Sequence, residues 1–318
     1  MTAETAYTGK IIQAPGSYIG MSMEAYHGQP CEGPSISSSG LRTIWTESPA
    51  HFWAHSSLNP NRVPPKENEA FNVGRLAHKL LIEGREGLEK DFSIRPDEWD
   101  DYRTKAARAW RDEQLLAGKT VVTEDDLADV TGMADSLGRH PLVRAGILDG
   151  KVERSLIWKD EETGVWLKAR PDVIPNASGL VADLKTTTSV RTDALEKSLG
   201  AFGYHVQAAL VGMGLRATLG IEMEEFALVW VEKEAPWCVR ITTLTGADIE
   251  RGQHQVRAAL RTFADCLSSG RWPGPGGDRQ DAEYLALPTW AAKRIDTELE
   301  LIAAETPDND NHLTDEAA

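Results

Sequence analysis

The stretch Lys168-Ala-Arg-Pro-Asp172, followed after a turn by Leu180-Val-Ala-Asp-Leu-Lys185, decides the fold and the chemistry that we expect. Side chains alternate between the two faces of a strand, so Asp183 and Lys185 point to the same face. Asp172 closes the preceding strand, and a carboxylate inside the apolar run around Asp183 is unexpected on a solvated face. Two carboxylates and a lysine at neighbouring strand ends therefore predict a compact site with the hard oxygen ligands that Mg²⁺ prefers.

Lys185 gives such a site a cation beside the metal ligands. Its ammonium group can orient or deprotonate an attacking water molecule, or neutralise charge on a phosphate in the transition state. A bound metal ion would lower the pKa of that water molecule. An Asp-x-Lys pair alone is more often part of a solvated strand face, and the preceding Arg170-Pro-Asp172 with its apolar flanks is the feature that favours a site.

The elements around this stretch have the order of a mixed α/β core with one mixed sheet flanked by helices. Hydrophobic spacing, caps and turns predict helices at 40–45, 49–55, 74–83, 97–117, 124–137, 193–219 and 245–269, and strands at 152–159, 165–173, 180–186, 226–232 and 237–244. We predict an N-terminal segment over residues 1–35, a single domain over 36–292 with its core at about 150–270, and a C-terminal segment over 293–318. This last segment ends in an acidic tail that is typical of disorder.

Composition excludes several classes of protein. The 318 residues include 34 Lys and Arg against 49 Asp and Glu, a net charge of −15, which argues against a protein that coats nucleic acid non-specifically. We find no membrane span, no signal peptide and no Gly-x-x-x-x-Gly-Lys-Ser/Thr motif, so neither a membrane association nor ATP is expected. The three scattered cysteines, Cys31, Cys238 and Cys266, predict no iron–sulfur cluster and indicate a reducing cytoplasm.

Several motifs together resemble a known family of nucleases. Pro171-Asp172 with Asp183-Leu-Lys185 resembles the signature of the PD-(D/E)xK nuclease superfamily. Between about Ile36 and Trp290, further segments make the chain similar to RecE-type (exodeoxyribonuclease VIII-like) exonucleases, which are often phage-borne; these segments are Ser37-Ser-Ser-Gly-Leu41, Ser48-Pro-Ala-His-Phe52, Phe71-Asn-Val-Gly-Arg-Leu-Ala-His78, His140-Pro141, Tyr204-His-Val-Gln207 and Leu287-Pro-Thr-Trp290. The resemblance implies a restriction-endonuclease-like core with an N-terminal helical extension.

The resemblance also implies an activity and partners. We expect an exodeoxyribonuclease that uses two Mg²⁺ ions, which Mn²⁺ can replace. The expected enzyme degrades linear double-stranded DNA 5′-to-3′ and leaves 3′ overhangs, which serve recombination by strand annealing. We also expect the chain to form a homo-oligomeric ring, with a tetramer favoured. Its expected partner is a RecT-like single-strand annealing protein, and its expected location is the bacterial host cytoplasm. Two alternatives stay open, namely an endonuclease of the same superfamily and a catalytically silent DNA-end-binding scaffold.

The resemblance assigns roles to individual residues. Asp172 and Asp183 are expected metal ligands, joined by His78 and by the Leu184 backbone carbonyl, while Lys185 serves the water molecule. Glu153, at the start of a predicted strand, is a further carboxylate near the metal, either as a direct ligand or as a residue that contacts a ligand. Gln207 is an expected catalytic residue, and Tyr204, three positions earlier, is expected to contact the DNA backbone and to brace Lys185; an amphipathic helix surface is the alternative for this pair.

Two groups of basic residues are candidates for contacts with DNA phosphates. Arg75 and Lys79 flank His78 and give its predicted helix a cationic face. A second group, which solvated helix surface explains nearly as well, consists of Arg103, Lys105, Arg108 and Arg111.

Overall fold

The computed structural model describes residues 4–64, 69–99, 101–175, 179–277 and 281–305. The chain divides into two units, Met1–Pro275 and Gly276–Ala318. The strands are β1 (Thr5–Ala6), β2 (Gly16–Ile19), β3 (Ser35–Ser37), β4 (Phe92–Ile94), β5 (Thr120–Val122), β6 (Gly150–Val152), β7 (Ser155–Lys159), β8 (Trp166–Ala169), β9 (Val173–Pro175), β10 (Leu180–Thr187), β11 (Glu225–Glu232) and β12 (Val239–Thr243). The helices are α1 (Met23–His27), α2 (Ser38–Thr46), α3 (Pro49–His55), α4 (Glu69–His78), the π-helix η1 (Lys79–Glu83), α5 (Gly84–Asp91), α6 (Lys105–Leu116), α7 (Glu124–Arg139), α8 (Pro141–Arg144), α9 (Thr192–Phe202), α10 (Tyr204–Leu219) and α11 (Gly246–Ser269), with α12 (Thr289–Glu305) in the second unit.

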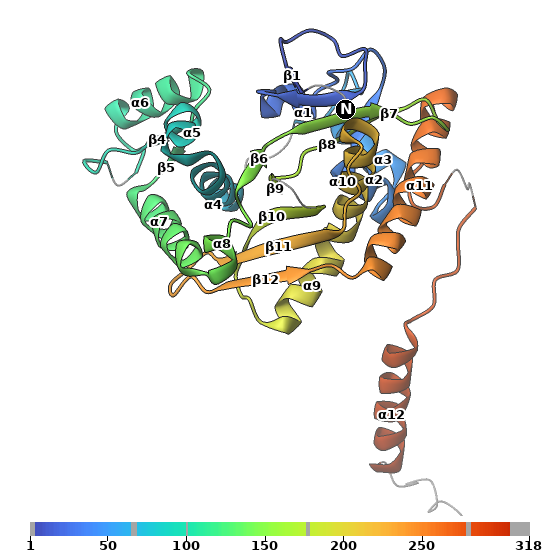
Figure 1. The fold of residues 1–318 in the computed structure, drawn as a ribbon. Helices are drawn as coiled ribbons and strands as arrows, with labels where there is room; N and C mark the ends of the chain where they lie inside the picture. The colour runs from blue at the N-terminus through green and yellow to red at the C-terminus, as the bar shows by residue number, and fades with distance from the viewer. Residues whose placement is uncertain (1–3, 65–68, 100, 176–178, 278–280, 306–318) are drawn as a thin grey trace, which may run out of the picture. The chain divides into compact units, whose positions relative to one another are not determined.

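Two five-stranded mixed sheets and one two-stranded sheet lie in the first unit (Figure 1). The orders are β1-β2-β7-β8-β3, β12-β11-β10-β9-β6 and β4-β5. The prediction of one sheet is therefore wrong. The strands expected at 152–159 and 165–173 each break and pass from one large sheet to the other, because Glu153 has a left-handed backbone (φ 53°) and Pro171 removes a ladder donor.

β10 is the central strand of the second sheet, and helices cover it on both sides (Figure 1). It pairs in parallel with β11 and antiparallel with β9. Val181 and Phe226 belong to a core shared with α10 and α11, whereas Ala182 and Val229 belong to a core shared with α4 and α7. The alternation along β10 therefore directs Asp183 and Lys185 to the same side as Val181, toward α10.

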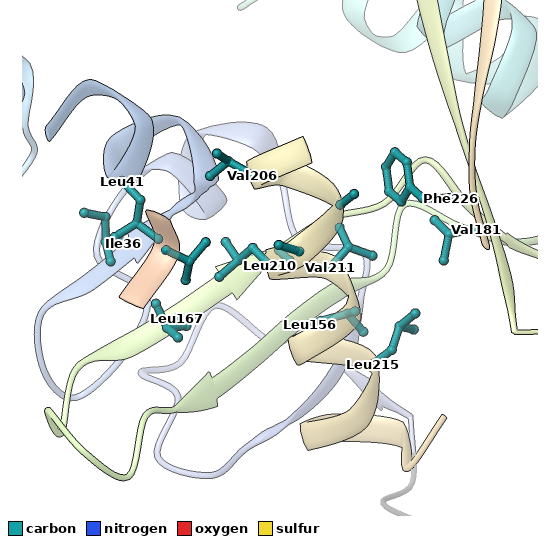
Figure 2. Close-up of a cluster of buried hydrophobic side chains, with 14 of the residues drawn as sticks. Ile36, Leu41, Leu156, Leu167, Val181, Val206, Leu210, Val211, Leu215 and Phe226 are labelled. Carbon is teal, nitrogen blue, oxygen red and sulfur yellow. The ribbon is translucent and has the colours of Figure 1, made fainter. Parts of the chain in front are cut away.

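α10 packs closely on the first sheet and on α11. Figure 2 shows Leu210 and Leu215 of α10 among the buried side chains of the first core, with Leu156 and Leu167 of the sheet nearby. Two glycines permit the close approach: a Cβ at Gly214 would come within 2.7 Å of the Trp158 ring, and a Cβ at Gly252 of α11 would overlap the backbone carbonyl of His205. The packing fixes α10, which carries two of the predicted site residues.

Two helix predictions need correction. The helix expected over 193–219 is interrupted at Gly203, whose left-handed backbone (φ 61°) ends α9, so Tyr204 begins a new helix. The helix expected over 97–117 begins at Lys105 (α6), because Thr104 is its N-cap and accepts a hydrogen bond from the Ala107 amide.

Other predictions are confirmed. The helix at 49–55, the hairpin of β11 and β12, and the long helix α11 lie where the patterns placed them, and Thr123 opens α7 with a capping box. Residues 5–37 contribute three strands to the first sheet, which the sequence patterns did not predict. The predicted disordered tail falls on 306–318, outside the described residues. Among the described helices, none has the length and apolar character needed to cross a bilayer.

Candidate metal centre

The centre lies at the bend where the chain passes between the two large sheets. The backbone amide of Glu153 donates a hydrogen bond to the carbonyl of Asp172 (3.1 Å), so the two residues face each other across the bend. Glu153 is in the left-handed region, which is costly for a residue with a Cβ and which clusters at functional sites. The strained bend brings the carboxylates of Glu153 and Asp172 to the same place.

His78, the last residue of α4, joins these carboxylates from a helix that packs against β10. Its Nε2 lies 2.8 Å from Asp172 Oδ1, and its Nδ1 lies 3.4 Å from Glu153 Oε1. The π-helix η1 begins directly after it at Lys79, and π-helical turns are frequent at functional sites because they shift side chains out of the regular α-helical register.

His78, Glu153 and Asp172 form a group suited to a divalent cation. One ligand atom from each residue can be chosen so that all three lie within 4.8 Å of one another. One imidazole and two carboxylates are ordinary ligands for divalent ions, and the carboxylates in particular suit Mg²⁺ and Mn²⁺. The donor set fits the predicted metal, and it includes Glu153, which the sequence placed only as an additional carboxylate.

Asp183 and Lys185 lie beside this group as a buried ion pair. Asp183 is fully buried, its Oδ2 contacts Lys185 Nζ, and its Oδ1 accepts a hydrogen bond of 2.8 Å from Gln207 Nε2. Lys185 Nζ also lies 4.9 Å from the centroid of the Tyr204 ring. Gln207 and Tyr204 thus reach the two β10 side chains from α10, and that Asp183 is a metal ligand stays a prediction.

A backbone contact connects the ion pair to the metal group. The amide of Leu184 donates to Asp172 Oδ2 (2.7 Å), so Asp172 uses one oxygen for β10 and the other for His78. That the carbonyl of Leu184 binds metal stays a prediction. This hydrogen bond fixes the Asp172 carboxylate without help from a bound ion.

Charge interactions within the cluster shift four pKa values. Burial opposes the charged form of His78, but the Asp172 and Glu153 carboxylates outweigh it and raise the His78 pKa to about 9. Burial likewise opposes ionisation of Asp172, yet His78 and Lys185 lower its pKa. Burial and the Asp172 charge raise the pKa of Asp183 to about 6. Burial also disfavours the Lys185 ammonium, but Asp183 and Asp172 raise its pKa overall, so Lys185 remains a cation.

The family of the chain follows from a comparison with known families. Residues 37–285 match the family described as "PDDEXK-like domain of unknown function (DUF3799)", which is most of the chain. The chain belongs to this family. Among solved structures, a putative exonuclease from Eubacterium rectale is similar with a TM-score of 0.57 and 14% identity over 86% of this chain and 98% of its own. A phage related exonuclease from Haemophilus somnus 129PT matches with a TM-score of 0.31 and 13% identity over 74% of this chain and 96% of its own. No curated protein matches.

A cleft of about 900 Å³ adjoins the metal group of this PDDEXK-like domain. His78, Glu153, Asp172 and Gln207 line it, together with the predicted phosphate contacts Arg75 and Lys79. Lys79 Nζ is paired with Asp91 Oδ2 at 2.8 Å. The basic side chains of the α4–η1 segment therefore face the same space as the metal group.

The second predicted basic group does not reach this cleft. Arg103 precedes α6, is paired with Asp101 and is 90% exposed, while Arg111 pairs with Asp112 and lies over the Tyr102 ring. Arg103, Arg108 and Arg111 are absent from the lining of the cleft. Their contact with DNA stays a prediction.

Arg170 is a further residue of the PDDEXK-like site, to which the sequence patterns assigned no role. Its Nη1 lies 3.7 Å from Glu153 Oε2, its Nη2 and Nε donate to Ser155 Oγ, and its guanidinium stacks on Tyr26 at 4.4 Å. The signal was available, because a residue two positions before Asp172 on an extended chain shares its face. Arg170 helps to hold Glu153 in the strained bend.

Proposed function

We propose that this PDDEXK-like protein is a Mg²⁺-dependent exodeoxyribonuclease. It degrades linear double-stranded DNA 5′-to-3′ and leaves 3′ overhangs, as the RecE-type resemblance implies. The observation that carries the proposal is the grouping of His78, Glu153 and Asp172 at one cleft, next to the buried Asp183–Lys185 pair that Gln207 of the same cleft contacts. The similar structure from Eubacterium rectale is described as a putative exonuclease, which supports the same activity class.

The residues of the site have distinct tasks in this proposal. His78, Glu153 and Asp172 would hold the metal, which supplies an activated water molecule and polarises the phosphate when bound. Lys185 stays protonated, so it stabilises the negative charge that builds on the phosphate and does not act as the base. Asp183 keeps that ammonium in place, and Gln207 fixes the orientation of Asp183.

Positively charged side chains in the cleft suit a phosphate backbone. Arg75 lines the cleft beside His78 with its side chain exposed, and Lys79 follows. Lys79 is held by Asp91 and would exchange that partner for a DNA phosphate. Local positive charge is needed because the net charge of −15 repels DNA from the protein as a whole.

The wider assembly is also part of the proposal. Four copies in a ring around the duplex would present the basic residues of the cleft to a central channel and keep the acidic surface outside. The 3′ overhang is useful only when it is paired, so a RecT-like single-strand annealing protein is the proposed partner, in the cytoplasm of a bacterial host.

Digestion of labelled DNA tests the activity. The protein is incubated with Mg²⁺ and with linear or closed-circular duplex, each 5′ or 3′ end of the linear form being labelled in turn. We expect early release of the 5′ label from linear DNA and no loss of circular DNA. Cleavage of both forms would indicate an endonuclease, and binding of ends without release of any label would indicate a catalytically silent scaffold.

A further inference from the structure

An exposed aromatic ring lies one ring away from Lys185. Phe202, the last residue of α9, is 54% exposed. Its ring packs against that of Tyr204 with centroids 5.8 Å apart and planes inclined by 35°, and Tyr204 in turn lies 4.9 Å from Lys185 Nζ. The buried Trp230 packs edge-on against the Tyr204 ring. Lys185 of the site is therefore connected through the Tyr204 ring to the solvent-exposed ring of Phe202.

A guanidinium group lies at the same position. Arg42 of α2 donates from Nη1 to the backbone carbonyl of Phe202 (2.7 Å). Burial raises the pKa of the Tyr204 hydroxyl, and the nearby Arg42 charge offsets a part of that rise. Within the part of the chain that the structure describes, the Arg42 guanidinium has no ion pair with a carboxylate. A guanidinium has five N–H donors, so one carbonyl leaves most of its capacity for a ligand.

Gly203 fixes the arrangement of these two side chains. Its left-handed backbone turns the chain between Phe202 and Tyr204 so that their rings meet. A Cβ at Gly203 would also come within 3.0 Å of Arg42 Cδ, so the stem of Arg42 lies directly against the glycine. Phe202 and Arg42 therefore form one surface that is already arranged in the free protein.

The chemistry of this surface fits an unpaired nucleotide. A base offers a flat face to an aromatic ring, and its phosphate offers charge to a guanidinium. Inside a duplex both faces of every base are covered by its neighbours, whereas an unpaired base in a single-stranded tail has a free face that can stack on Phe202. The Tyr204 ring contacts both the Phe202 ring and the Lys185 ammonium, so a nucleotide on Phe202 would lie one ring away from Lys185.

We propose that Phe202 and Arg42 bind an unpaired nucleotide of the DNA strand at the metal centre, with the base stacked on Phe202 and a phosphate paired with Arg42. This inference rests on the proposed nuclease function and adds to it a preference for ends whose terminal bases are separated. Phe202 and Arg42 are binding residues in this account, and the hydrolysis itself is assigned to the metal centre.

Binding of two matched DNA ends tests the inference. One duplex has a short unpaired tail, and the other has the same tail with abasic residues; affinity is measured by fluorescence anisotropy with Ca²⁺, so that the metal group is filled while hydrolysis is suppressed. We expect Phe202→Ala to weaken binding of the base-bearing tail about 10-fold and to leave the abasic tail unchanged, since stacking needs the base. Phe202→Trp should retain the wild-type difference between the two tails.

A control and a second variant sharpen the test. Leu142→Ala removes another exposed apolar side chain, on α8, and should change neither affinity. Arg42→Gln should weaken both tails and reduce the slope of log affinity against log salt by about 1, as expected for one lost phosphate contact.

The outcomes separate this inference from the proposed function. If wild-type protein digests linear DNA but Phe202→Ala weakens both tails equally or neither, the nucleotide surface is wrong and the nuclease function stands. If Phe202→Ala dissociates an oligomer and leaves both affinities unchanged, the surface belongs to a second copy of the chain and the inference is overturned. If the wild-type protein neither binds nor digests DNA, both fail.

Discussion

The affinity of the site for a divalent ion should rise steeply with pH, because His78 carries a proton in the metal-free protein. Its Nε2 lies 2.8 Å from Asp172 Oδ1, and the carboxylates raise its pKa to about 9. The ion pair therefore stabilises the metal-free state below the ordinary histidine pKa, and this stabilisation is lost as the pH rises through about 9. A metal ion needs neutral imidazole, so binding must expel this proton.

The size of the effect follows from the shift. At pH 7, about one protein molecule in a hundred has neutral His78, which makes metal binding less favourable by about 3 kcal/mol. Between pH 7 and 8, where Asp183 with its pKa of about 6 is already mostly ionised, the Kd should fall about tenfold.

Calorimetry with Mn²⁺ measures the Kd at each pH and the number of protons released on binding. Titrations in two buffers of different ionisation enthalpy should give about one proton released per ion at pH 7. His78→Gln should bind Mn²⁺ more weakly, with no proton release and no change of Kd over the same range. Wild-type protein that binds Mn²⁺ with a constant Kd and no proton release would refute the reasoning that His78 is a protonated ligand.

Three further predictions follow from other contacts. Asp183→Ala leaves the Lys185 ammonium without its buried partner and should cost about 3 kcal/mol of unfolding free energy, measured by urea denaturation; an unchanged midpoint would contradict the ion pair. Lys185→Ala should keep Mn²⁺ and DNA affinity yet lose turnover, since its charge acts on the transition state; a variant whose only defect is weaker DNA binding would make Lys185 a phosphate contact. Gly252→Ala should lower the melting temperature because its methyl group would overlap the His205 carbonyl, whereas Gly246→Ala, with open space around it, serves as the matched control and should not.

Local patterns in the sequence were sufficient for much of the fold. Period-2 alternation placed Asp183 and Lys185 on one face, and they form an ion pair there. Capping residues gave the starts of α7 and α11, and the hairpin of β11 and β12 followed from its two apolar runs. These features depend on neighbours within a few residues, so a single sequence contains the information.

Features of the fold that depend on contacts between distant residues could not be predicted from local sequence patterns. The break between β6 and β7 depends on the backbone of Glu153, and nothing in its side chain marks a left-handed conformation. The interruption at Gly203 falls within a continuous helical pattern, and an isolated glycine is tolerated inside such a pattern, so the sequence did not mark the end of α9. Glu153 could therefore be named as a carboxylate near the site, but its pairing with His78 and Asp172 needed the structure.

The rate of Mg²⁺-dependent hydrolysis by a Glu153→Gln variant tests the central claim most directly. Release of nucleotides from linear duplex is compared with wild type and with Glu161→Gln, an exposed carboxylate on the turn between β7 and β8. The account predicts that Glu153→Gln loses about 100-fold or more in rate, since even a residue that only orients a metal ligand contributes about 10- to 100-fold, and that Glu161→Gln keeps the wild-type rate. A Glu153→Gln variant that folds and hydrolyses DNA at the wild-type rate would contradict the assignment of His78, Glu153 and Asp172 as the metal centre.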